Sequence, residues 1–201
     1  MPVLRRVVLL RHGETQGDSA SRFHGSNDVA LSDAGRHQIR EAVHGLKGEV
    51  FELVVASPLR RSWQSAAIVA GTAPVRLEAG FREIHFGRWE GLSLEEIQAR
   101  DPILCEDWQA GREGFEYPSG ERRADFRARV LAAFSSIEAS GAANVLCVLH
   151  KGVIRVIAEH LGGEPLERDQ PALGCSVSFT RAAGGSWRAG RRSSNPEALV
   201  A

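Results

Sequence analysis

Apolar runs of strand length alternate with helix-like segments along most of the chain. Residues 7–10, 53–56 and 145–149 form short, continuous apolar runs, which are typical of strands buried on both faces. Each run is followed by polar residues and then by apolar residues at helical spacing. This alternation predicts an α/β fold with three layers, α/β/α, around a mostly parallel central sheet.

Capping residues predict where several helices begin and end. Ser32 is a suitable N-cap, and Ser57 followed by Pro58 predicts a second helix that starts with proline at its first position. Gly162 and Gly163 should stop the last helix. The expected buried stripes are Ile39, Ala42, Val43 and Leu46; Leu59, Trp63, Ala66, Ala67 and Ala70; Phe126, Val130, Phe134 and Ile137; and Val153, Ile154, Ile157, Ala158 and Leu161.

The length of the chain favours a single domain over residues 1–201. Residues 93–120 lack strand signals and contain two prolines, which predicts an excursion of short helices and loop. Residues 176–180, a Gly184-Gly185 turn and Trp187 predict a β-hairpin. We expect the tail after about residue 193 to be frayed.

Composition excludes several classes of protein. Lys plus Arg equals Asp plus Glu, 25 against 25, which argues against a nucleic-acid binder. No apolar run approaches the roughly 20 residues that span a bilayer, and the N-terminal run is too short for a signal peptide. We therefore expect a cytoplasmic protein without a membrane partner. The three cysteines are widely spaced, which favours buried thiols over disulfides or a zinc site.

Four segments carry the polar groups that could perform chemistry. They are residues 11–15, 57–62, 81–87 and 150–155, placed after apolar runs at the edge where α/β sheets bind ligands. Among their side chains are the imidazoles of His12 and His150, several arginines and the carboxylic acid of Glu83. Arginines match phosphate oxygens, a neutral imidazole can act as a nucleophile, and a carboxylic acid can protonate a departing alkoxide. The set therefore suits phosphoryl transfer.

Two other interpretations of these segments stay open from the residues alone. A histidine at a strand end is often only a hydrogen-bonded structural residue, and arginines at helix starts are often solvated. A metal site built from His12, His150 and Glu83 is also conceivable, because histidine is a common ligand. The arginines in the same segments argue against it, since they would repel a cation.

The motif Arg11-His12-Gly13-Glu14-Thr15, after an apolar run, resembles the signature of the histidine phosphatase superfamily, also called phosphoglycerate-mutase-like. Such a resemblance implies the phosphoglycerate-mutase-like α/β/α fold. It extends in order over nearly the whole chain, through residues 22–35, 57–65, 81–83, 86–91, 118–121 and 150–155.

The resemblance implies a role for each matching residue. His12 would be the nucleophile that becomes phosphohistidine, and Glu83 the general acid. Arg11, Arg61 and His150 would bind the phosphate, with His150 also part of the catalytic set. Arg61 is chosen because the family arginine lies two residues after a leucine. The substrate side of the site would include Thr15, Gln16, Asp18 and Gly25.

Four positions depart from the family pattern without removing a catalytic group. Asp18 stands where many members carry asparagine, and Ser62 and Ser65 replace alanine and threonine. Lys151 replaces the usual glycine, and we expect its side chain to point to solvent.

The function implied is that of a phosphomonoesterase that hydrolyses a small phosphorylated metabolite with no metal or other cofactor. Two alternatives are a phosphoglycerate mutase and a non-catalytic module that binds a phosphorylated ligand. Residues 90–121 hold nine acids against two bases, a difference of −7, which would oppose a bisphosphorylated intermediate. Residues 86–91 also resemble the phosphatase branch. The resemblance further suggests a homodimer.

Overall fold

The central sheet has six strands in the order β3-β2-β4-β1-β5-β6. The structure, a computed structural model, describes residues 3–17, 21–162, 165–167 and 169–193. The first four strands in this order run parallel, and β5 and β6 run antiparallel to their neighbours. The strands are β1 (Arg6–Arg11), β2 (Leu53–Ala56), β3 (Val75–Leu77), β4 (Asn144–Leu149), β5 (Ser176–Arg181) and β6 (Trp187–Arg192).

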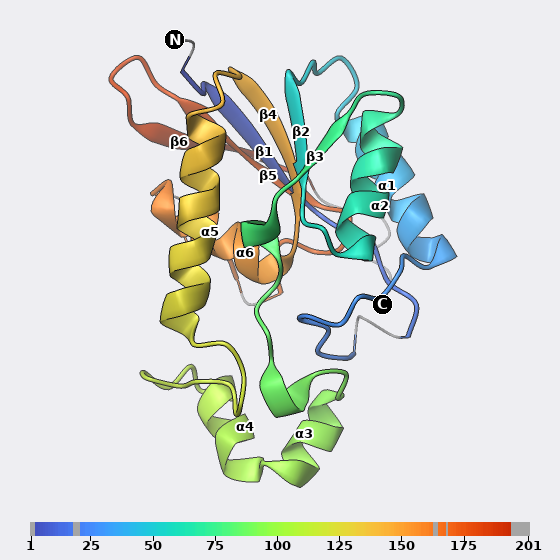
Figure 1. The fold of residues 1–201 in the computed structure, drawn as a ribbon, viewed down its shortest axis with the longest axis vertical. Helices are drawn as coiled ribbons and strands as arrows, with labels where there is room; N and C mark the ends of the chain where they lie inside the picture. Colours follow the sequence, from blue (N-terminus) through green and yellow to red (C-terminus); the bar gives the residue numbers. More distant parts are fainter. Residues whose placement is uncertain (1–2, 18–20, 163–164, 168, 194–201) are drawn as a thin grey trace.

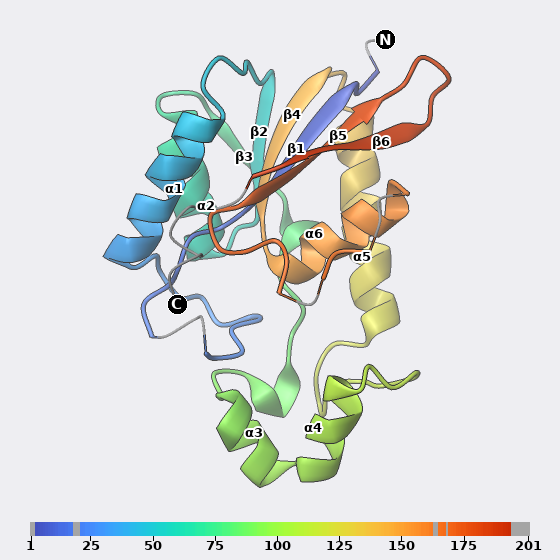
Figure 2. The same cartoon turned by 180° about the vertical axis from the view of Figure 1, so that it is seen from behind.

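Helices cover both faces of this sheet, which confirms the three-layer α/β/α fold (Figures 1 and 2). One face carries α1 (Asp33–Gly45) and α2 (Arg60–Ala70), and the other carries α5 (Arg123–Glu138) and α6 (Lys151–His160). Side chains alternate along each strand, so β1 contributes to two separate apolar cores. Val7 and Leu9 pack in the core under α5 and α6, whereas Val8 and Leu10 pack in the core under α1 and α2.

The start of α2 differs from the prediction. The helix begins at Arg60 with Leu59 as its N-cap, so Ser57 is not the N-cap and Pro58 is not the first helical residue. Ser57 instead makes a local turn, in which its hydroxyl oxygen accepts a hydrogen bond from the Leu59 amide at 3.3 Å. The Ser57 amide donates to Ser62 Oγ at 3.0 Å, which ties the end of β2 to the first turn of α2.

The buried face of α2 was predicted only in part, because Leu59 and Ala66 are buried but two other members of the predicted stripe are exposed. Trp63 is 39% exposed and Ala67 is exposed, whereas Arg61, Ser62 and Ser65 are buried. Polar groups can occupy this face because each serine hydroxyl has a partner. Ser62 donates to the carbonyl at the end of β4 (2.7 Å to Val148 O), and Ser65 donates to Arg61 O at 2.7 Å. The face is polar because it borders the strand ends where the candidate site lies.

The other helices and the hairpin form as predicted where the structure describes them, although in the stripe of α1 only Ile39 is fully buried and Ala42 and Leu46 are partly buried. Ser32 caps α1 by accepting from the Gly35 amide, and the predicted stripes of α5 and α6 are buried. The hairpin of β5 and β6 turns through Gly185, whose φ of 85° favours glycine. Gly163 and the tail after residue 193 lie outside the described residues. All three cysteines are buried, as expected.

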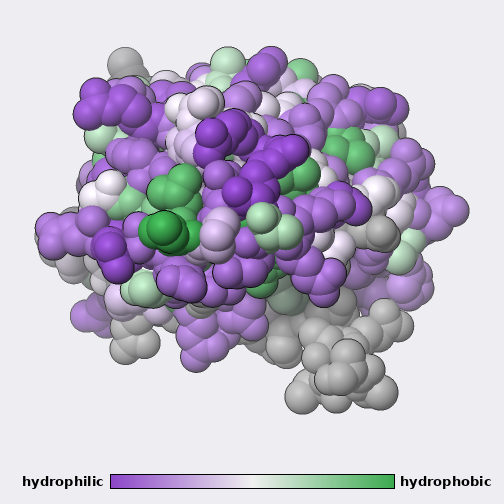
Figure 3. Space-filling model, turned by 90° about the horizontal axis from the view of Figure 1, so that it is seen from below, coloured by the Kyte–Doolittle hydropathy of each residue, from purple (hydrophilic) through white to green (hydrophobic). Residues whose placement is uncertain are grey.

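Residues 93–120 form a separate cap beside the sheet, with helices α3 (Leu94–Arg100) and α4 (Pro102–Gln109). Short 3-10 turns at Ala79–Phe81 and Gly87–Trp89 lead into it. The cap has a small core of its own, made of Trp89, Ile97, Cys105 and Phe115. Seen from the end that carries α3 and α4, the surface is mostly hydrophilic with small hydrophobic groups between (Figure 3). Among the described residues, no helix has the length and apolar character to cross a membrane.

Candidate active site

The two histidines of the site follow the last residues of two neighbouring parallel strands. Arg11, the last residue of β1, pairs with Leu149, the last residue of β4, so His12 and His150 follow side by side. The His12 amide donates to Leu149 O at 3.0 Å, and the two imidazole ring centres lie 5.1 Å apart. This is the carboxyl edge of the sheet, where ligands of α/β folds bind.

Four of the predicted catalytic and phosphate-binding side chains line one large cavity at this edge. Its volume is about 1620 Å³, and its walls include Arg11, His12, Arg61 and Glu83. His150 is fully buried behind His12. The structure therefore brings together side chains from β1, α2, the loop before the cap and the start of α6.

The tautomer of His12 follows from one hydrogen bond. Its Nδ1 lies 2.7 Å from the carbonyl oxygen of Gly13, and a carbonyl oxygen can only accept. Nδ1 therefore carries the proton, and Nε2 keeps its lone pair. Burial, together with the positive charges of Arg61 and Arg11, holds the pKa of His12 well below its ordinary value. A neutral imidazole with a free Nε2 is the nucleophilic form.

Close packing of the backbone fixes the loop that carries His12. A Cβ at position 13 would collide with the carbonyl oxygen of Gly35, so only glycine fits there. The Gly13 amide donates to Ser65 Oγ at 3.3 Å, which links this loop to α2. The nucleophile candidate is thus held by the backbone of its own loop and by the polar face of α2.

His150 has two ring nitrogens without a hydrogen-bond partner among the residues that the structure describes. Burial and the neighbouring Arg61 hold the pKa of this imidazole well below its ordinary value. A buried polar atom without a partner costs about 1–3 kcal/mol. A phosphate oxygen bound against the ring would accept a hydrogen bond from it and remove that cost.

Arg61 and Arg11 supply the positive charge. The Arg61 side chain is 1% exposed, and its guanidinium donates to three carbonyl oxygens of residues 24–27, at 2.6 to 2.9 Å. Arg11 donates to the carbonyl oxygen of Pro171 at 2.9 Å, and burial lowers its pKa to about 10. Neither guanidinium forms an ion pair with a carboxylate among the described residues. Their charge is therefore available to an anion.

Glu83 is held at the mouth of the cavity by backbone amides. Its Oε1 accepts from the Ile84 amide at 3.0 Å, and its Oε2 accepts from the Gly152 amide at 2.9 Å. A Cβ at position 152 would collide with Glu83 Oε1, so glycine there makes room for the carboxyl group. Arg129 fixes the backbone on the other side, donating to Glu83 O at 3.2 Å while pairing with Glu121 at 2.6 Å.

Glu90 is a supporting residue that we did not predict for the site. Its carboxylate accepts hydrogen bonds from the loop whose carbonyls hold Arg61 and from the 3-10 turn beside it. The donors are the amides of Gly25 (3.2 Å), Ser26 (2.8 Å), Asn27 (3.3 Å) and Phe86 (2.9 Å). Glu90 thereby shapes loop 25–27. It belongs to the 86–91 motif, but no sequence pattern indicates that its carboxylate accepts hydrogen bonds from four backbone amides.

Glu90→Gln should lower kcat/KM for phosphomonoesters by about 10–100-fold, because hydrogen bonds to a charged group contribute ~1.5–3 kcal/mol. Loss of these bonds lets loop 25–27 relax and releases the Arg61 guanidinium. The inhibition constant of orthovanadate should rise in parallel. A loss of catalysis alone would leave that constant unchanged. Glu106→Gln, an exposed position on α4, is the control. Unchanged vanadate inhibition in a folded Glu90→Gln protein would contradict this role.

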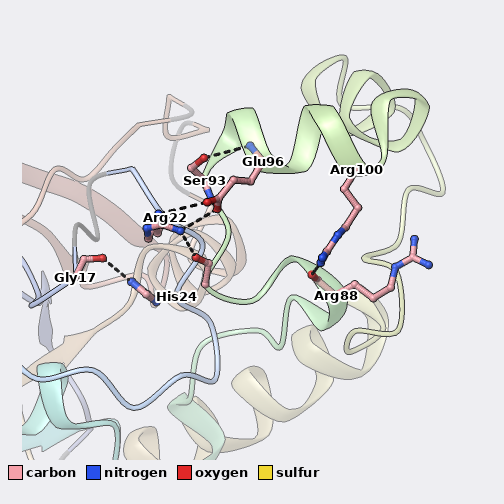
Figure 4. A network of polar contacts seen from close by, with 8 residues as sticks. Gly17, Arg22, His24, Arg88, Ser93, Glu96 and Arg100 are labelled. Carbon is pink, nitrogen blue, oxygen red and sulfur yellow. Dashed lines mark hydrogen bonds and ion pairs between the residues drawn. The ribbon is translucent and has the colours of Figure 1, made fainter.

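The described residues among those predicted to bind substrate do not line the cavity. Thr15 is buried in a bridge with Leu31, Gln16 is exposed, and neither lines the cavity. Gly25 acts through its carbonyl on Arg61, and Asp18 lies outside the described residues. Arg22 and His24 line the nearby wall instead. Figure 4 shows Arg22 hydrogen-bonded to Glu96, and His24 hydrogen-bonded to the Gly17 carbonyl.

Lys151 differs from the prediction that it points to solvent. It is part-buried and lines the cavity, because the first turn of α6 faces the site. The alternative of a metal centre finds no support in the described part of the chain. There, no three histidine, cysteine, aspartate or glutamate side chains are arranged to hold a metal ion, the trio His12, His150 and Glu83 included.

Acid should destabilise the protein through His12 and His150. Burial lowers the pKa of both imidazoles in the folded state, whereas in the unfolded chain they titrate near 6.5. Below that pH the unfolded state binds more protons, so the free energy of unfolding falls as pH falls, by up to about 1.4 kcal/mol per pH unit for each histidine. Urea unfolding at pH 7, 6 and 5 measures this. An equally steep decline in His150→Gln would contradict the contribution of His150.

Comparison with known proteins agrees with this geometry. Residues 7–194 match the histidine phosphatase superfamily (branch 1). Glucosyl-3-phosphoglycerate phosphatase of Mycobacterium tuberculosis is 33% identical over 90% of this chain and 86% of its own length. Adenosylcobalamin/alpha-ribazole phosphatase of Escherichia coli is 31% identical over 81% of each chain.

A solved structure shows the same likeness in three dimensions. The mycobacterial glucosyl-3-phosphoglycerate phosphatase, in complex with VO3, superimposes with a TM-score of 0.77 at 29% identity. The match covers 92% of this chain and 97% of that one. With its histidine-arginine pocket at the carboxyl edge of the sheet and a family match over nearly its whole length, the chain belongs to the histidine phosphatase superfamily.

Proposed function

We propose that this protein is a phosphomonoesterase that transfers the phosphoryl group of a small phosphorylated metabolite to His12 and then to water. One observation carries the proposal. The Nδ1–H of His12 is bound to Gly13 O, which leaves Nε2 as a neutral nucleophile in a pocket with two guanidiniums that pair with no carboxylate of the described residues. A pocket of this kind attracts a phosphate dianion and presents a nucleophile to its phosphorus.

The proposed reaction has two steps. In the first, Nε2 of His12 attacks phosphorus, the ester P–O bond breaks, and Glu83 gives its proton to the departing oxygen. In the second, Glu83 takes a proton from water, the water oxygen attacks phosphorus, and the P–N bond breaks to release inorganic phosphate. Arg11, Arg61 and His150 bind the phosphoryl oxygens throughout, where they stabilise the charge of the transition state.

The relatives support a hydrolytic reaction. Two carry names of phosphatases, and one was solved with vanadate, a phosphate analogue, bound. We further propose one domain over residues 1–201 with residues 93–120 on the substrate side, and substrate binding by Thr15, Gln16, Asp18 and Gly25 stays a prediction. A cytoplasmic location and a homodimer also stay predictions.

The acidic tract at residues 90–121 does not separate a phosphatase from a mutase. Of its nine acids, Glu95 and Glu96 line the cavity, and Glu96 is paired with Arg22 at 2.8 Å. Most of that charge lies outside the cavity walls, so it would not repel a bisphosphorylated intermediate at short range. The reaction itself must distinguish the two activities.

The test is an assay of the full chain with p-nitrophenyl phosphate, a panel of phosphorylated metabolites and 3-phosphoglycerate. We expect release of inorganic phosphate that persists in EDTA, because guanidinium and imidazole groups, not a metal ion, bind the phosphate. Isomerisation of 3-phosphoglycerate without phosphate release would indicate a mutase. Vanadate binding without hydrolysis of any ester would indicate a binding module. Loss of activity in EDTA with recovery in magnesium or zinc would contradict the mechanism.

A further inference from the structure

The cavity is basic although the chain as a whole is neutral. Seven of its lining side chains are basic and four are acidic, whereas the complete sequence has 25 of each. The basic ones are Arg11, Arg22, Arg61, Arg123, Arg127, Lys151 and Arg155, and the acidic ones are Glu83, Glu95, Glu96 and Glu159. Part of this excess has no role in binding the scissile phosphate, so it needs a separate explanation.

Among the described residues, ion pairing within the cavity leaves Lys151, beside the phosphate pocket, without a carboxylate partner. Arg22 pairs with Glu96 at 2.8 Å, and Arg127 pairs with Glu159 at 2.7 Å. Among the described residues, Lys151 forms no ion pair or side-chain hydrogen bond. An ammonium that loses part of its hydration without gaining an anion is unfavourable.

The place of Lys151 in the chain puts it beside the leaving group. It stands between His150, which belongs to the phosphate pocket, and Gly152, whose amide holds the carboxyl group of Glu83. Glu83 must reach the bridging ester oxygen, so this part of the wall faces the atoms just beyond that oxygen. One turn further along α6, Arg155 lines the same wall and extends its positive charge.

We propose that the substrate carries a second anionic group, a carboxylate or a second phosphate, in its leaving group, and that Lys151 binds it. This inference rests on the proposed phosphomonoesterase function and names the class of substrate. The scissile phosphate already has two guanidiniums and two imidazoles. Burial is the main cause that lowers the pKa of Lys151, and the positive charge of Arg11 outweighs the opposing effect of Glu83.

A matched pair of ligands tests the proposal by binding rather than turnover. 3-Phosphoglycerate and glycerol 3-phosphate differ in one group, a carboxylate in the first and a hydroxymethyl in the second. Titration calorimetry on the His12→Ala protein, which cannot form the covalent intermediate, measures both dissociation constants. We expect 3-phosphoglycerate to bind about tenfold more tightly, as a charge-assisted contact allows.

The variants then assign that preference to one side chain. Adding Lys151→Met should abolish the preference, and Lys151→Arg should restore much of it. Lys47→Met, at the other lysine of the sequence and exposed after α1, should leave it unchanged. Equal binding of the two esters, or no binding of either, would overturn the proposal. Equal weakening of both by Lys151→Met would also overturn it, because Lys151 would then contact the scissile phosphate.

The outcome is separate from that of the proposed function. If the original protein hydrolyses no ester but the preference depends on Lys151, the phosphomonoesterase function fails and the anion site stands. If hydrolysis is observed but the preference is absent, the function stands and the second anion site is wrong.

Discussion

His12→Ala should reduce kcat/KM for every phosphomonoester by about 10⁶-fold, the scale on which loss of a covalent nucleophile acts in serine proteases. The loss should be similar for alkyl and aryl esters, because the variant lacks the phosphoryl acceptor itself. Arg11, Arg61 and His150 remain, so vanadate should still bind. Steady-state assays with p-nitrophenyl phosphate and glycerol 3-phosphate measure the effect.

A surface histidine provides the control for that result. His37 is exposed on α1, away from the cavity walls, so His37→Ala should keep full activity. A His12→Ala protein that retained activity within about tenfold of the original would mean that water attacks phosphorus directly, since no alternative nucleophile could replace His12 at so small a loss.

Glu83→Gln should harm alkyl esters far more than p-nitrophenyl phosphate. An alkoxide is a poor leaving group and needs a proton in the transition state, a contribution of about 10²–10⁴-fold, whereas p-nitrophenolate leaves without one. The ratio of kcat/KM for glycerol 3-phosphate to that for p-nitrophenyl phosphate should therefore fall by about that factor. Using the ratio removes any loss that affects both substrates alike.

Gly152→Ala offers an independent route to the same result. The new Cβ would occupy the place of Glu83 Oε1, so the carboxyl group must move while its chemistry is kept. The substrate ratio should fall in this variant too. Equal losses on both substrates in Glu83→Gln would show that Glu83 serves only to position the phosphate or hold the fold. The proton donor would then have to be another titratable group, with His150 the first candidate.

Regular apolar patterns made much of the fold predictable. Continuous apolar runs indicated β1, β2 and β4, and the 3.6-residue spacing of Phe126, Val130, Phe134 and Ile137 indicated α5. These elements bury apolar side chains on one or both faces, so their sequence period reflects their packing. α2 was predicted poorly because the face it buries contains Arg61, Ser62 and Ser65, which a hydrophobic pattern assigns to solvent.

The candidate site was predictable only in part, for a related reason. The histidines and arginines lie in recognisable motifs at strand ends, so their proximity follows from sheet topology. The surroundings of Glu90 and Lys151 come from segments distant in the sequence. Glu90 gathers the amides of a loop more than 60 residues away, and Lys151 is drawn into the cavity by the first turn of α6. Contacts of this kind depend on the folded chain rather than on local spacing.

The most direct test of nucleophilic catalysis is to trap the phosphorylated enzyme. The full chain is mixed briefly with a ³²P-labelled ester, quenched in base, digested and mapped. We expect label on His12 as a phosphoramidate, stable in base and lost in acid, and no label in His12→Ala. Label on a serine, or no covalent species under conditions where its breakdown is slow, would contradict phosphoryl transfer to His12.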